Sequence, residues 1–139
     1  MFMQNNRNEI RDFYIKSWQK KLKNEPLESL EKQIVSIIVE HPEYQTLLEN
    51  EDVIDKDFIP ENGQTNPFLH MGLHLAIREQ VSTNRPQGIK EAYLILVKKH
   101  GQEKAEHLIM DCLVESIWQS QKYGTTPDEA SYLNNIKRL

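Results

Sequence analysis

The stretch Asn66–Gln80, which reads NPFLHMGLHLAIREQ, decides the fold of this chain. Asn66 can cap the free N–H groups at the start of a helix, and Pro67 suits the first helical position because it has no N–H to lose. Apolar side chains then recur at helical spacing and cover nearly the whole circumference of the helix. A helix that is apolar on nearly every side is typical of a buried one. We therefore expect the other helices to pack around a central buried helix of about residues 67–83.

Helical periodicity continues through the rest of the chain, and no segment reads as a strand. Further helices are predicted at about residues 8–23, 26–40, 42–48, 89–100, 102–123 and from 127 onward. The helix at 102–123 has two apolar faces, so it is expected to be covered on both. Gly72 lies inside the central helix, where glycine costs about 1 kcal/mol relative to alanine, and a close helix–helix crossing there would compensate. The prediction is an all-α, single-domain bundle of six to seven helices.

The composition is that of one globular domain spanning residues 1–139. Charged residues make up 27% of the chain and apolar residues 38%, which is enough for a hydrophobic core. The net charge of −4 gives no general attraction to nucleic acid or to anionic membranes. No segment reaches the roughly 18 apolar residues of a membrane span, and the N-terminus lacks the apolar region of a secretory signal. Because Cys112 is the only cysteine, a reducing cytoplasmic location is expected.

The longest irregular stretch is acidic and lies at residues 49–65. The spacing of Asp52, Asp55 and Asp57 does not follow the calcium-binding loop of an EF-hand, and Pro60–Gly63 reads as a turn. The glycines of the chain are scattered and form no nucleotide-binding loop. Four apolar residues predict that this stretch packs against the domain: Val53, Ile54, Phe58 and Ile59.

Several short motifs together resemble a known family. They are NPFLH followed by HLAI and EQ within residues 66–80, HPEY at 41–44, ENGQT at 61–65, EH at 106–107 and IWQ at 117–119. This pattern is similar to the bacterial domain-of-unknown-function family numbered 1841, over nearly the whole chain. The resemblance implies a small cytoplasmic bacterial protein that forms one unit. It implies no activity and assigns no catalytic residue.

Two histidines four residues apart are the most chemically suggestive feature. His70 and His74 would project from one face of the central helix and could supply two imidazole ligands to a divalent transition metal. His107 of the 102–123 helix could complete a three-histidine site, with Asp111 one turn later as a further ligand or as an imidazole-orienting group. Such a site keeps one position open for water, and Glu79 or Glu106 could serve as a base.

A structural interpretation competes with the metal site and is favoured from the sequence alone. Interior histidines commonly form hydrogen bonds to one another, to a carboxylate such as Asp111, or to loop carbonyls. No glutamate follows His70, so the zinc-protease pattern is absent, and metal-free acid–base catalysis is a third alternative. His41 lies at a joint between two helices and is expected to be a cap or a surface residue. Cys112 falls on an apolar stripe and is expected to belong to the core, without a neighbour that would activate it.

Two classes of function follow from these residues. The first is a non-enzymatic binding or interaction domain with a protein partner, for which Trp18, Trp118 and Tyr123 could act as anchors. The alternative is a helical metal-binding protein with a three-histidine site, and possibly a metal-dependent hydrolase. The first class is favoured. Nucleic-acid binding is not expected, because four lysines at the end of the first helix match the helix dipole instead: Lys16, Lys20, Lys21 and Lys23.

Overall fold

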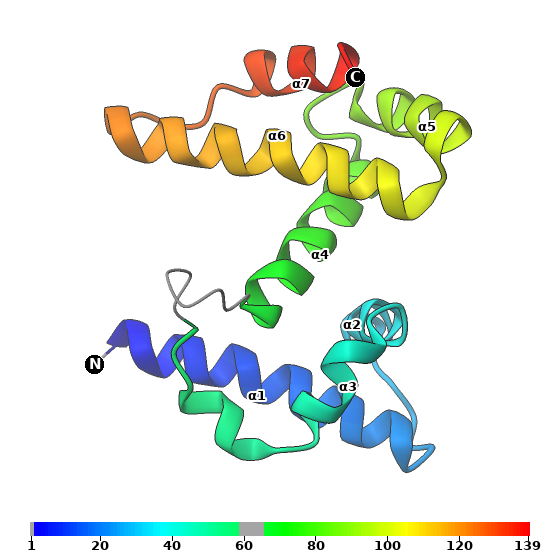
Figure 1. The fold of residues 1–139 in the computed structure, drawn as a ribbon, viewed down its shortest axis with the longest axis vertical. Helices are drawn as coiled ribbons and strands as arrows, with labels where there is room; N and C mark the ends of the chain where they lie inside the picture. The colour runs from blue at the N-terminus through cyan, green and yellow to red at the C-terminus, as the bar shows by residue number, and fades with distance from the viewer. Residues whose placement is uncertain (1, 59–65) are drawn as a thin grey trace. The chain divides into compact units, whose positions relative to one another are not determined.

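The computed structural model describes residues 2–58 and 66–139 (Figure 1). Within these ranges the chain forms seven α-helices and one 3₁₀-helix, and no strand. The elements are α1 (Phe2–Leu22), α2 (Ser29–Val39), α3 (Pro42–Leu48), η1 (Glu51–Asp55), α4 (Pro67–Thr83), α5 (Ile89–His100), α6 (Gln102–Tyr123) and α7 (Glu129–Lys137). The all-α prediction is therefore confirmed. The turn predicted at Pro60–Gly63 and the packing of Ile59 lie outside the described residues.

The chain divides into two compact units at α4. The first unit ends at Leu75 and the second begins at Ala76, so α4 contributes residues to both. That residues 1–139 form one domain stays a prediction.

The first unit is built on the packing of α1 against α2 and η1. The start of α2 differs from the prediction at Pro26, because the Glu31 carboxylate accepts a hydrogen bond from the Glu28 backbone N–H at 2.8 Å and fixes the helix start at Ser29. The other carboxylate oxygen of Glu31 pairs with Lys20 at 2.9 Å. The core of this unit contains the following side chains: Tyr14, Ile15, Trp18, Ile34, Val35, Ile37, Ile38, Leu48, Val53, Phe68 and Met71.

The segment after α3 packs down, as its apolar residues predict. Val53 is buried, and Ile54 and Phe58 are partly buried against the core. Buried Arg11 of α1 holds this segment, since its guanidinium donates hydrogen bonds to the Ile54 carbonyl at 2.9 Å and to the Lys56 carbonyl at 2.7 Å. These bonds satisfy backbone oxygens that a non-helical segment would otherwise leave without partners.

Helix α4 begins as the sequence predicts. The Asn66 side-chain oxygen accepts hydrogen bonds from the N–H groups of Phe68 and Leu69 at 3.0 and 3.2 Å. The helix is not buried on every side, however, because Leu69 is 61% exposed. Among the described residues, a Cβ at Gly72 would meet only the Tyr14 hydroxyl, at 4.0 Å, so the expected close crossing at this glycine is wrong.

The second unit packs α5, α6 and α7 together, with the end of α4. Ala105, Ile109 and Leu113 of α6 are buried, together with Ile89 and Leu96 of α5. The second apolar face predicted for α6 is covered only at Met110. Three later side chains of α6 are exposed, so the expectation that both faces are covered along the whole helix is wrong: Val114, Ile117 and Trp118.

Candidate metal centre

His41 lies at the joint between α2 and α3 and is only 7% exposed, so the prediction of a surface residue is wrong. The alternative prediction of a capping role is closer, because His41 Nδ1 lies 2.7 Å from the carbonyl oxygen of Ile37 in the last turn of α2. A carbonyl can only accept, so Nδ1 carries the proton of this hydrogen bond. In the neutral ring the lone pair is then on Nε2, the nitrogen that can bind a metal.

His70 and His74 meet on α4 as their spacing predicts. Their Nε2 atoms lie 3.2 Å apart, and their ring centroids are separated by 4.8 Å at an angle of 73°. His74 is only 2% exposed and His70 is half-buried. Two nitrogens bound to one tetrahedral zinc at about 2.05 Å would be about 3.3 Å apart. The observed separation therefore suits a shared metal as well as it suits an N–H···N hydrogen bond.

The three rings of His41, His70 and His74 form one cluster inside the first unit. The His41 centroid lies 5.1 Å from that of His70 and 4.9 Å from that of His74. Each ring offers a nitrogen, and these nitrogens all lie within 4.8 Å of one another. Tyr44 stacks on His41 with ring planes 3° apart, which restricts the rotation of that imidazole. The cluster thus brings together three imidazoles, each with a ring nitrogen that can bind a metal, in a largely buried place.

His107 and Asp111 are on α6, in the second unit. His107 is half-buried and Asp111 is exposed. Their participation in a site with His70 and His74 stays a prediction.

Glu106 does not have the environment of a general base. Its buried carboxylate pairs with the Arg78 guanidinium at 3.2 Å and accepts hydrogen bonds from the Tyr93 hydroxyl at 3.0 Å and from the Gln102 amide at 3.2 Å. Burial, and then the Glu106 charge, raises the pKa of Tyr93 to about 12, so the phenol remains a donor. These contacts join α4, α5 and α6, and we interpret Glu106 as structural.

Cys112 is half-buried, and burial followed by the charge of Asp111 raises the pKa of its thiol. A raised pKa keeps the sulfur in its protonated, poorly nucleophilic form at neutral pH. This agrees with the expectation that Cys112 is not an activated nucleophile.

Sequence reasoning missed His41 as a member of the cluster. Its position before Pro42 indicates only that one helix ends and another begins. The signal at this position is the HPEY motif at 41–44, which contributes to the family resemblance but does not by itself indicate a metal ligand.

Among the described residues, no helix has both the length and the apolar character needed to span a membrane. No curated protein and no solved structure matches the chain. A family model described as a domain of unknown function does match, over residues 6–138. The chain therefore belongs to the DUF1841 family.

Proposed function

We propose that this protein binds a divalent transition-metal ion through His41, His70 and His74. The observation that carries the proposal is the convergence of three ring nitrogens within 4.8 Å of one another. An ion about 2.0–2.1 Å from each nitrogen would require them to approach to about 3.3 Å, which small rotations of the side chains can provide. The pair on α4 is already at 3.2 Å.

The environment of His41 supports this function. Histidines that bind metals commonly donate the other ring N–H to a carbonyl or carboxylate, and this contact fixes the tautomer and the orientation of the ring. The bond from His41 to the Ile37 carbonyl, at 2.7 Å, has this form.

The donor set favours certain metals. Imidazole nitrogens suit Zn²⁺, Cu²⁺, Ni²⁺ and Co²⁺, whereas Mg²⁺ and Ca²⁺ prefer oxygen ligands. Three protein ligands leave a fourth position for water, which would favour hydrolytic chemistry. Under this proposal His107 is the candidate fourth ligand, and its participation would close the site and favour a structural or storage role.

The test is the metal content of protein purified without an affinity tag. We expect near-stoichiometric zinc, nickel, cobalt or copper in the wild type, and loss of it in His41→Ala and His74→Ala. His100→Ala is the matched control, because His100 is an exposed histidine at the end of α5. Circular dichroism confirms that each variant is folded. A wild-type protein that stays empty after metal is added would contradict the proposal.

His107→Ala separates the two forms of the site. Retention of the metal with unchanged affinity would indicate three ligands and an open position. A large loss of affinity would make His107 the fourth ligand.

A second candidate function is the interaction domain, which one observation favours. Val114, Ile117 and Trp118 are exposed at helical spacing on α6, and Trp118 is 52% exposed. Of the predicted aromatic anchors, Trp118 and Tyr123 are on the surface, but Trp18 is 6% exposed and belongs to the core. Trp118→Ala should therefore abolish a stable complex with a protein partner, whereas Trp18→Ala would act only by destabilising the fold.

A further inference from the structure

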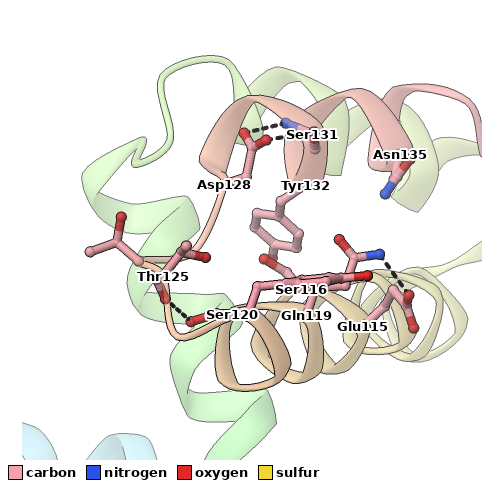
Figure 2. Close-up of a pocket in the computed structure, with 11 residues that line it drawn as sticks. Glu115, Ser116, Gln119, Ser120, Thr125, Asp128, Ser131, Tyr132 and Asn135 are labelled. Atoms are coloured by element: carbon pink, nitrogen blue, oxygen red, sulfur yellow. Dashed lines mark hydrogen bonds between the residues drawn. The ribbon is translucent and has the colours of Figure 1, made fainter.

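A polar cavity of about 300 Å³ lies between the C-terminal half of α6 and the start of α7, within the second unit (Figure 2). Its walls carry hydroxyl, amide and carboxylate groups, and none of the described residues that line it is a lysine, an arginine or a histidine. The 11 lining residues are Glu115, Ser116, Gln119, Ser120, Tyr123, Thr125, Thr126, Asp128, Ser131, Tyr132 and Asn135. A volume of this size is at the lower end of the range for small-molecule sites.

Three hydroxyl groups in the wall donate their protons to other protein atoms. Ser120 donates to the Thr125 carbonyl at 2.6 Å, and Ser131 donates to the Asp128 carboxylate at 2.9 Å (Figure 2). Tyr132 donates to the Gln80 side-chain oxygen at 2.6 Å. A hydroxyl has one proton and two lone pairs, so each of these oxygens can offer a ligand only an acceptor.

Two carboxylates add negative charge to this set of acceptors. Asp128 accepts the backbone N–H of Ser131 at 3.1 Å as the N-cap of α7, and its hydrogen bonds lower the pKa of its carboxyl. Glu115 accepts a hydrogen bond from the Gln119 amide at 2.9 Å, so the position of its side chain is restrained (Figure 2). Two carboxylates without a cation in the lining disfavour anions and favour a ligand that carries N–H donors and positive charge.

An aromatic ring at the cavity supplies a further feature. Tyr123 is 67% exposed, and the ammonium of Lys122 already lies 5.4 Å from the centre of its ring. An ammonium at this distance from a phenol ring is attracted by the negative face of the ring. The face of Tyr123 can therefore attract a cation, although the Lys122 ammonium would compete for it.

We propose that this cavity is a binding site for a small organic ammonium ligand, such as a primary amine or a short polyamine. The ammonium N–H groups would be donors to the hydroxyl oxygens and to the carboxylates of Glu115 and Asp128. A neutral polyol could use the acceptors but would gain no attraction from the two exposed carboxylates. This site is independent of the histidine cluster of the first unit.

Calorimetric titration of the full chain with spermidine tests the proposal. The protein is first dialysed against a chelator, so that the amine cannot bind through a metal. We expect saturable binding of spermidine and much weaker binding of glucose, the neutral probe, and of Mg²⁺, the inorganic cation. Asp128→Asn keeps a good capping residue while it removes the charge, and Glu115→Gln keeps the shape of its side chain. Each variant is expected to bind spermidine about tenfold more weakly.

The matched control is Glu103→Gln, which removes the same charge from the first turn of α6, away from the cavity. Its affinity should equal that of the wild type. Three outcomes would overturn the proposal: no saturable binding of spermidine, equal weakening in Glu103→Gln, or tighter binding of glucose than of spermidine. Equal weakening would mean that the amine is attracted only by the general negative charge.

Discussion

Each unit of the molecule buries a cluster of polar side chains, and the two clusters are chemically opposite. In the second unit the Glu106 carboxylate meets donors from Arg78, Tyr93 and Gln102. In the first unit three imidazoles meet one another, and each neutral ring has only one N–H to donate. The first arrangement matches acceptors to donors, which is typical of a structural network. The second brings together ring nitrogens whose lone pairs can bind a cation.

Breaking the Glu106 cluster should give the largest effect on stability. Arg78→Ala leaves the carboxylate buried without its cation, and we expect a loss of about 3–5 kcal/mol in the free energy of unfolding. Urea denaturation followed by circular dichroism measures this loss. Arg85→Ala, at an exposed position in the following turn, is the control. If the two variants lost the same small amount, the interpretation of Glu106 as a structural centre would be wrong.

Binding of a metal to the histidine cluster should stabilise the folded protein. A bound metal at a hundred times its dissociation constant should raise the free energy of unfolding by about 2.7 kcal/mol. The gain should be absent in His74→Ala and unchanged in His100→Ala. Because a metal binds the neutral imidazole, protons compete with it, and the gain should fall as the pH is lowered from about 8 to about 5. Thermal denaturation with and without added Zn²⁺ measures the effect, and a gain that does not depend on pH would argue against imidazole ligands.

Tyr93→Phe removes one donor from the Glu106 carboxylate and leaves the ring. We expect a loss of about 1.5 kcal/mol at neutral pH, the lower end for hydrogen bonds to charged groups. The phenol has a pKa raised from 10.0 to about 12 in the folded protein. Its contribution is therefore fully present below pH 10, and it is lost as the pH rises toward 12. The difference in stability between wild type and Tyr93→Phe should shrink over this range, and a constant difference would contradict the assigned contact.

Gly72→Ala should give the smallest change in the free energy of unfolding, and this change should be a gain in stability. The position lies between His70 and His74 on α4, and a Cβ there would be 4.0 Å from its nearest neighbour, the Tyr14 hydroxyl. We expect the variant to gain about 1 kcal/mol, because alanine is the better helix former. Metal affinity should be retained, since the helix that carries both ligands is unchanged. A loss of stability would show that the space at Gly72 is needed.

Local patterns were enough to predict most of the helices. The cap at Asn66 and the pairing of His70 with His74 follow from contacts between residues that are close in sequence. The exposure of Leu69 and Trp118 did not follow, because periodicity says which side chains share a face and not whether another element covers that face.

The clusters themselves were harder to predict than the helices. His41 joins His70 and His74 only through the packing of the joint between α2 and α3 near α4. Glu106 was interpreted as a candidate base because the sequence does not show that Arg78 and Tyr93, on two other helices, surround it. Both cases depend on contacts between segments that are distant in sequence.

The hydrogen bond from His41 Nδ1 to the Ile37 carbonyl has a spectroscopic consequence. A buried imidazole proton held at this distance should exchange slowly with water and give a resolved downfield signal in the proton NMR spectrum. The ¹⁵N shifts of the same ring report which nitrogen carries the proton, so the tautomer can be determined without any variant. Titration with a diamagnetic ion such as Zn²⁺ should then move the Nε2 resonance and leave the Nδ1 proton in place. The NMR signals of the His41 ring would therefore report directly whether a metal is bound.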